Sequence, residues 1–276
     1  MLDIEVVISE NEERFDTSLV EKGIERSEII NEDTYDYSCA FVVDGIASNA
    51  LSDDFYIRMQ NHHFFFLGKV EVLNTAINHE IKNSSLISIQ DLRAVTTPII
   101  YSYFHADTNG TFFKRGIYNK KNNHNEGFTV FTLVQEITEE VMNALFLANF
   151  LADNYVNTKN ITFCINFKRL KNAVLHYSAA ASTSPFYLQP TNQKECIIEN
   201  EDVSFTTKIP LKVDLSNSDA VLCIVKEIFK KIVCEFGENI VFDGDIDNAF
   251  AERFNSTKAL FLRYIIDNNG EYKRLK

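Results

Sequence analysis

The sequence predicts an α+β fold with a mixed, largely antiparallel sheet and helices packed against it. Strand-like and helix-like segments are intermixed, without the regular rhythm of a doubly wound sheet. Glycine (9) and proline (4) are scarce in the 276 residues, which favours long regular elements over a sandwich of many tight turns. The hydrophobic share of 45% is typical of a chain that buries a core.

The first third of the chain is expected to form short strands and weakly amphipathic helices. Residues 2–8 (LDIEVVI) alternate loosely and are rich in β-branched side chains, which favours a strand. Residues 11–30 are polar and acidic, with Phe15 and Ile24 near helical spacing, which favours a helix. Further elements are expected as strands at 37–43 and 55–59, a helix in the second half of 62–82, and a helix-like start to 88–103 that Pro98 interrupts.

The remaining elements begin with a long-looped β-hairpin at about 111–134. Its arms are the aromatic and β-branched runs 111–118 and 128–134, joined by the turn-forming residues NKKNNHNEG. Thr138 is a suitable cap for a largely apolar helix through 155. Strands are then expected at 161–167 and 203–213, and helices at 218–236 and 247–267; Gly237 is placed to end the first of these helices, and Pro210 favours a sheet edge.

The domain organisation is expected to follow this pattern. Residues 1–177 would form an α+β domain, and residues 195–276 a smaller, mostly helical portion, possibly of the same domain. The small, polar, proline-containing stretch 178–194 is the candidate linker or loop between them.

Charge is distributed unevenly along the chain. Residues 1–54 carry 15 Asp and Glu against Arg14, Lys22 and Arg26, so the whole net charge of −12 resides there. Residues 55–194 carry 13 bases and 9 acids, and residues 195–276 carry 11 bases and 15 acids. Such asymmetry indicates an interface with a basic surface, either on a partner or within this molecule.

The five cysteines form no CxxC pair and are mostly flanked by apolar residues, so buried free thiols are expected. The N-terminus has no signal-peptide pattern, and no apolar run is long enough to span a bilayer. A soluble, cytoplasmic protein without a membrane partner is therefore expected.

Two basic clusters are candidates for binding nucleic acid or another anion. Cations that neutralise phosphate and aromatic rings that stack on bases are what such a surface needs. The alternatives are a solvated hairpin tip for the first cluster and a surface turn after a strand for the second. The first comprises Lys114, Arg115, Lys120, Lys121 and His124, and the second comprises Lys168, Arg169 and Lys171.

Glu80-Ile81-Lys82 matches the short E-x-K pattern of metal-dependent nucleases, in which a carboxylate holds a divalent ion and the lysine stabilises developing charge. Asp54, or alternatively Asp53 or Asp44, would supply a second carboxylate, and Mg²⁺ or Mn²⁺ would be the cofactor. The tripeptide is common by chance, and it falls on an expected helix rather than a strand. A charged helix face is the simpler interpretation.

Three further patterns are weaker. The alternate carboxylates at 243–247 lack the glycine and glutamate of a helix–loop–helix calcium site, so a polar turn explains them better. His62, His63 and His79 have no cysteine partner nearby, and the serines near His176 lack an elbow motif. The chain also contains no phosphate-binding glycine loop, dinucleotide fingerprint or HExxH.

The interpretation that this sequence favours is a non-enzymatic binding or regulatory protein, with no cofactor, whose acidic N-terminal surface engages a basic protein surface or a charge-matched partner subunit. The residues expected to bind that partner are Glu12, Glu13, Asp16, Glu21, Glu25, Glu28, Glu32 and Asp33. The alternative is a metal-dependent enzyme that processes nucleic acid and holds its substrate with the basic middle segment.

Overall fold

The computed structural model describes only part of the chain, and all structural statements below refer to that part. The described residues are 3–45, 79–82, 85–94, 99–107, 109–119, 121–122, 125–126, 128–129, 137, 140–141, 160–171, 174–177, 194–210 and 218–237. They confirm the α+β class, since an antiparallel sheet is combined with helices.

Two compact units interleave along the chain. The first comprises Met1–Asn119, Asn143–Arg169 and Ser204–Val213, and the second comprises Lys120–Met142, Leu170–Val203 and Asp214–Lys276. Of the stretch 178–194, expected as a linker or loop, residues 178–193 lie outside the described part, and Lys194 begins a strand.

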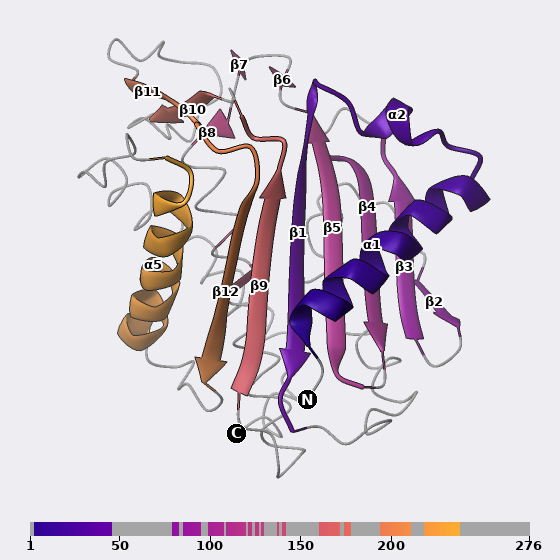
Figure 1. Ribbon diagram of the computed structural model, residues 1–276, viewed down its shortest axis with the longest axis horizontal. Coiled ribbons are helices and arrows are strands. Elements are labelled where there is room, and N and C mark those ends of the chain that lie inside the picture. The colour runs from indigo at the N-terminus through magenta and orange to yellow at the C-terminus, as the bar shows by residue number, and fades with distance from the viewer. Residues whose placement is uncertain are drawn as a thin grey trace. The chain divides into compact units, whose positions relative to one another are not determined.

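The first unit is built on a sheet in the order β12-β9-β1-β5-β4-β3-β2 (Figure 1). From β9 to β2, each strand pairs antiparallel with the next. The strands are β1 (Thr34–Val43), β2 (His79–Lys82), β3 (Ser85–Asp91), β4 (Ile99–Asp107), β5 (Thr111–Asn119), β9 (Asn160–Lys168) and β12 (Val203–Pro210). The expected strands at 37–43 and 161–167 are confirmed, as is the part 203–210 of the strand expected at 203–213, whose residues 211–213 lie outside the described part. Strand β12 stands at an edge of the sheet, as Pro210 indicated.

The central strand β1 is buried along its whole length because both of its faces are covered. Its odd-numbered side chains join an aromatic layer, in which Tyr35 stacks on Tyr118 at 4.9 Å and Phe41 packs against Phe163 at 5.3 Å between ring centroids. Its even-numbered side chains face helix α1 (Ile4–Glu21) and the short helix α2 (Arg26–Ile29).

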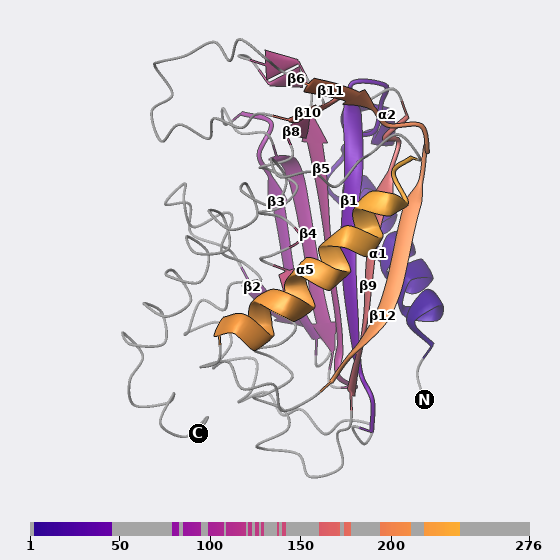
Figure 2. The ribbon, with the colours of Figure 1, turned by 90° about the vertical axis from the view of Figure 1, so that its left-hand side faces the viewer.

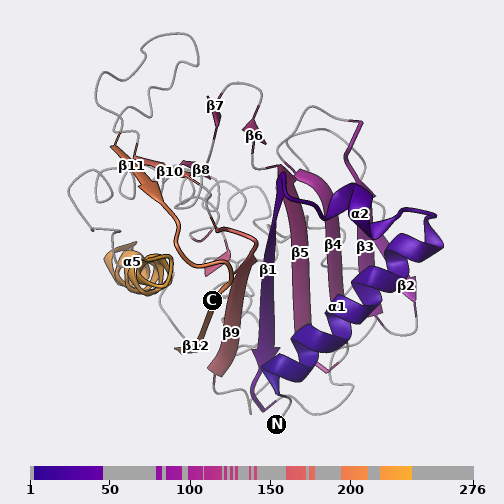
Figure 3. The same ribbon diagram turned by 45° about the horizontal axis from the view of Figure 1, so that its top comes forward.

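Helix α1 lies diagonally across one face of the sheet, from β1 toward β3 (Figures 1–3). The strand expected at 2–8 is therefore wrong. Asp3 caps the helix, with its side chain accepting a hydrogen bond from the Glu5 backbone at 3.1 Å. Ile4, Val7 and Ile8 then follow helical spacing and are buried against the sheet, so tertiary burial outweighs their β-propensity.

The helix expected to continue to residue 30 ends instead at Glu21. Gly23 adopts φ +67°, and the Ile24 amide donates to the Leu19 carbonyl at 2.9 Å while the Gly23 amide donates to Val20. These two hydrogen bonds form a Schellman motif, which satisfies carbonyls at the helix end. Leu19 and Ile24 both belong to the core beneath the helix.

Two further expectations are corrected in this unit. The helix-like start expected for 88–103 is wrong, because β3 and β4 occupy that region as paired strands. Strand β5 confirms the strand at 111–118, but its neighbours are β1 and β4. Both edges of β5 are thus taken by strands other than the expected hairpin arm at 128–134, of which residues 130–134 lie outside the described part.

Where it is described, the second unit contains shorter strands and the long helix α5 (Ser218–Cys234). Strand β10 (Val174–Tyr177) pairs antiparallel with β11 (Lys194–Ile197) and parallel with β8 (Phe128–Thr129), and β6 (Lys121–Asn122) pairs with β7 (Asn125–Glu126). Helix α5 confirms the helix expected at 218–236. Glu140 and Val141 are helical, as expected after Thr138, but Ile137, which precedes the expected cap, is helical too, so the expected start of this helix is wrong. The helix expected at 247–267 lies outside the described residues.

Candidate functional site

The underside of α1 is held to the sheet by an aromatic anchor. Phe15 is fully buried and makes edge-to-face contacts with Tyr101 and Tyr103 of β4, with ring centroids 5.5 and 5.9 Å apart. The guanidinium carbon of Arg115 lies 4.1 Å from the centre of the same ring, within the range of a cation–π contact. Phe15 therefore joins the helix to strands β4 and β5.

The apolar contacts of α1 make the helix part of the core of the first unit. Five large apolar side chains of the helix are buried: Ile4, Val7, Ile8, Phe15 and Leu19. At about 2 kcal/mol each, they contribute roughly 10 kcal/mol, an upper value. This upper value is comparable with the net stability of a typical domain, so the packing of α1 is a major contribution to the stability of the first unit.

A buried ion pair lies in the layer between α1 and the sheet. Arg115 Nε donates to Asp36 Oδ1 at 2.9 Å, and Arg115 Nη2 donates to Oδ2. Both side chains are only 3% exposed. Burial opposes the charge of Arg115, but hydrogen bonding and charge attraction from Asp36 outweigh it and raise the pKa of the guanidinium. Arg169 Nη1 lies 3.6 Å from the same carboxylate.

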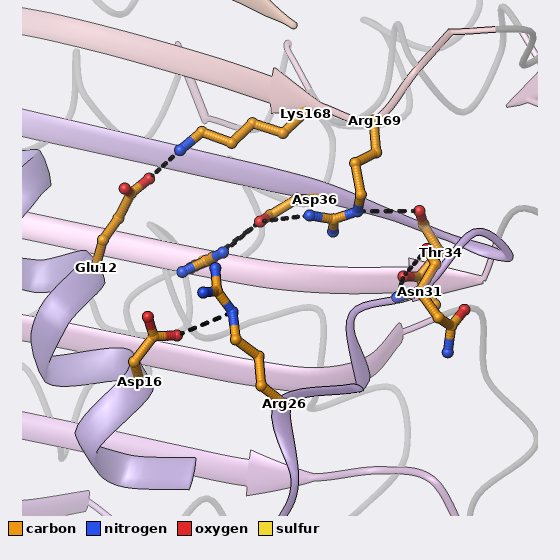
Figure 4. A network of polar contacts seen from close by, with 9 residues as sticks. Glu12, Asp16, Arg26, Asn31, Thr34, Asp36, Lys168 and Arg169 are labelled. Atoms are coloured by element: carbon orange, nitrogen blue, oxygen red, sulfur yellow. Dashed lines mark hydrogen bonds and ion pairs between the residues drawn. The ribbon is translucent and has the colours of Figure 1, made fainter. Parts of the chain in front are cut away.

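Further ion pairs surround this one at the surface (Figure 4). Lys168 Nζ lies 2.5 Å from Glu12 Oε1, which joins β9 to α1. Arg26 Nε lies 3.5 Å from Asp16 Oδ1, which joins the start of α2 to α1. These partners are partly exposed, so each pair contributes at most about 1 kcal/mol.

Two more acids of the N-terminal segment pair with cations from distant parts of the sequence. Arg93 contacts Glu28 at 2.6 Å and Asp91 at 2.7 Å, and the hydrogen bonds from Arg93 lower the pKa of Asp91. Lys208 Nζ lies 3.7 Å from Asp44 Oδ2. Glu12, Glu28, Asp36 and Asp44 thus all face bases from outside residues 1–54. The acidic segment meets its charge-matched surface partly within the molecule.

The outer surface of α1 and α2 keeps an excess of carboxylates. Of the residues expected to bind a partner, Glu12 and Asp16 are turned to internal cations, whereas Glu13, Glu21, Glu25, Glu28, Glu32 and Asp33 are exposed. Glu5 and Glu10 are exposed as well. Glu28 is exposed but pairs with Arg93, so we call the exposed carboxylates of Glu5, Glu10, Glu13, Glu21, Glu25, Glu32 and Asp33 the acidic face.

The first basic cluster is not assembled as a hairpin tip. Arg115 and Lys114 lie within strand β5, where they are 2% and 7% exposed. The Arg115 guanidinium is bound to Asp36 and is shielded from a phosphate backbone. Lys121 lies on β6, of which only the backbone is described, and Lys120 and His124 lie outside the described residues.

The second basic cluster follows β9, as expected, but two of its members already contact carboxylates. Lys168 pairs with Glu12, and Arg169 lies beside Asp36 with its Nε donating to the Thr34 carbonyl at 3.4 Å. Arg169 adopts φ +63°, a conformation rare for residues other than glycine. Lys171 is exposed in the turn that follows.

The E-x-K tripeptide lies on the edge strand β2, so its expected placement on a helix is wrong. Asp44 directly follows β1, and β1 and β2 are separated by three strands in the sheet order. Asp53 and Asp54 lie outside the described residues. Within the described part of the chain, no three His, Cys, Asp or Glu side chains are grouped so as to hold a metal ion.

The weaker patterns find little support. His79 and His176 lie on β2 and β10, while His62, His63 and residues 243–247 lie outside the described part. The expectation of buried thiols holds for two cysteines, Cys39 and Cys164. It is wrong for Cys223 and Cys234, which are exposed.

His105 of β4 is a buried titratable group that the sequence did not indicate. It is 3% exposed, and its Nε2 lies 3.3 Å from Arg14 Nη1 on α1. In the tautomer that accepts from Arg14 the proton is on Nδ1, which has no hydrogen-bond partner among the described residues. Burial, together with the charge of Arg14, lowers the pKa of His105 to about 4.

Compared with protein-family models, with curated proteins and with solved structures, the chain matches none of them. Among the described helices, none has the length and apolar character needed to cross a bilayer.

Proposed function

We propose that this protein is a binding or regulatory module, and that its acidic face engages a basic surface of a partner protein. The observation that carries this proposal is the division of the N-terminal acids into two sets. Glu12, Asp16, Glu28 and Asp36 lie beside cations of the same unit, whereas the residues of the acidic face are exposed to solvent.

Geometry supports a rigid binding surface. The buried underside of α1 fixes the helix on the sheet, so the exposed carboxylates are held in a constant arrangement. Binding a partner then requires little further ordering of the backbone of α1, so little binding free energy is lost to it. The negative charge of the acidic face speeds association with a basic partner. This attraction weakens with rising salt, because exposed charges are screened.

Deletion of the segment is unsuitable as a test, because it would remove α1 and β1 from the core. Point substitutions at exposed positions avoid this. We expect Glu13→Lys/Glu21→Lys to weaken binding of a lysine oligomer at low salt by about tenfold, since two attractive charges become repulsive. Fluorescence anisotropy of the labelled oligomer measures this.

A matched control keeps the same change in net charge. Glu201 and Glu235 are exposed and belong to the second unit, so Glu201→Lys/Glu235→Lys alters the total charge equally but leaves the acidic face intact. The control is expected to weaken binding only slightly. Equal losses in the two double variants would mean that the oligomer senses net charge alone, and would overturn the proposal.

A further inference from the structure

We propose that the partner segment that this protein binds is a basic amphipathic helix, which lies along α1 and is anchored at both ends by apolar contacts. This inference rests on the proposed function and names the kind of partner. It is drawn from one stripe of side chains on the outer surface of α1, which we call the outer stripe: Val6, Glu10, Glu13, Thr17 and Val20.

The outer stripe follows the spacing of a helix-packing seam. Its five members are separated alternately by four and three residues, which places them on one side of the helix. All five are exposed, and they lie opposite the buried side of α1 formed by residues such as Val7 and Phe15.

The two ends of the outer stripe are apolar and open to solvent. Val6 is 49% exposed and Val20 is 77% exposed, and they are the exposed large hydrophobic residues among those the structure describes. Single exposed apolar residues are ordinary on a protein surface. Here both occur on the same side of one helix, fourteen positions or about 21 Å apart, with carboxylates between them.

The chemistry of the outer stripe selects its occupant. Glu10 and Glu13 require cations opposite the middle of the stripe, and Val6 and Val20 require apolar side chains opposite its ends. Arg14 pairs with Glu10 at 3.7 Å, but both are well exposed, so this contact is weak and replaceable. A helix with the same four-and-three spacing presents side chains in that arrangement along the whole stripe.

Other occupants fit less well. Nucleic acid would bring phosphates against Glu10 and Glu13, which is a like-charge contact. A second copy of this chain docked through the same stripe would bring those carboxylates against their own counterparts. An extended strand binds to the open edge of a sheet through its backbone, and the surface of a helix offers no such edge.

The test uses two labelled synthetic peptides of identical composition. The first is a basic amphipathic helix with two leucines spaced as Val6 and Val20 are, and with lysine and arginine between them. The second carries the same residues in an order that places the leucines on opposite sides of the helix. We expect the first peptide to bind the intact protein about tenfold more tightly than the second.

Two double variants separate the contributions. Val6→Ser/Val20→Ser is expected to weaken binding of the first peptide about tenfold and to leave the second unchanged. Glu13→Lys/Glu21→Lys is expected to weaken both peptides. Because all four positions are exposed, each variant keeps its core, and circular dichroism checks that the fold is retained.

The outcomes distinguish this inference from the proposed function. If the valine variant binds both peptides as the wild type does while the glutamate variant loses them, the acidic face binds basic partners but the anchored helix is overturned. If the glutamate variant also binds normally, the proposed function fails. Self-association in sedimentation that the valine substitutions abolish would identify a second copy as the occupant, and would also overturn the inference.

Discussion

Arg115 of β5 and Asp36 of β1 form a hydrogen-bonded ion pair beneath α1, although 79 positions separate them in the sequence. Their strands are neighbours, and the register places Ser38 directly opposite Arg115, so Asp36 reaches the guanidinium along the diagonal. The ion pair joins β5 to β1, and Arg115 also lies over the Phe15 ring of α1. The most acidic part of the chain is thereby tied to a buried cation.

Removal of one partner of this ion pair is expected to be strongly destabilising. Asp36→Ala leaves Arg115 as a buried charge without its carboxylate, at a cost of about 3–5 kcal/mol in the free energy of unfolding. The double variant Asp36→Leu/Arg115→Met removes both charges and should recover most of that loss. Urea unfolding compares the wild type, Asp36→Ala and the double variant. As a control, Glu12→Gln, which breaks a partly exposed ion pair, should lower the free energy of unfolding by no more than about 1 kcal/mol. Equal losses in the single and double variants would contradict this account.

The aromatic anchor gives a second prediction. Phe15→Ala removes a fully buried ring that contacts Tyr101, Tyr103 and Arg115, so the free energy of unfolding should fall by about 3–5 kcal/mol. Val20→Ala is the matched control on the same helix, because Val20 is exposed, and it should change stability by no more than about 0.5 kcal/mol. Thermal unfolding followed by circular dichroism compares them. Similar midpoints for the two variants would show that α1 is not held by this anchor.

His105 predicts a dependence of stability on pH. Its pKa of about 4 in the folded protein is below the ordinary value of about 6.5, since burial and the neighbouring charge of Arg14 disfavour the imidazolium, while Asp107 opposes this shift. Between these two values the unfolded chain binds a proton that the folded protein does not. Stability should therefore fall as the pH drops from about 6.5 to 4, by about 3 kcal/mol at most.

The contribution of His105 can be isolated by substitution. Urea unfolding of the wild type and of His105→Gln across this pH range gives two curves of stability against pH, and the wild type should lose more stability than the variant as the pH falls. Parallel curves would mean that other groups cause the acid sensitivity.

The cysteines should differ in reactivity. Cys223 and Cys234 are exposed and should react with a thiol-specific reagent in the native protein. Cys39 and Cys164 are buried, and burial raises the pKa of the Cys164 thiol, so both should react only after unfolding. Peptide mapping by mass spectrometry assigns each modified position. Rapid native modification of Cys164 would show that the layer beneath α1 opens readily.

Part of this architecture can be predicted from local sequence. Strands β1 and β9 are recognisable because continuous aromatic and β-branched runs suit a strand that is covered on both faces. Helix α5 is recognisable because its apolar positions recur every three or four residues and Ser218 and Gly237 lie at its ends. In these segments propensity, periodicity and burial agree.

Elsewhere local patterns were ambiguous. Ile4, Val6, Val7 and Ile8 favour a strand by composition, yet they form the first turns of α1, because Asp3 caps the helix and the sheet buries one side of it. In the segment 88–103 the local pattern favours a helix at first, yet the segment contributes to strands β3 and β4. These strands form because β3 pairs with β4 and β4 pairs with β5. Strand pairing is a non-local interaction, which periodicity within one segment does not contain.

The candidate site shows the same division. By itself, the sequence determined that residues 1–54 carry all of the net charge, and this indicated an interface with a basic surface. Only the tertiary structure decided which carboxylates face inward and which face outward. Glu12, Asp16 and Asp36 lie beside cations because α1 and β1 bring them to Lys168, Arg26 and Arg115, whereas the acidic face remains in solvent. Net charge is a sum over residues, but the pairing of charges depends on distances that only folding sets.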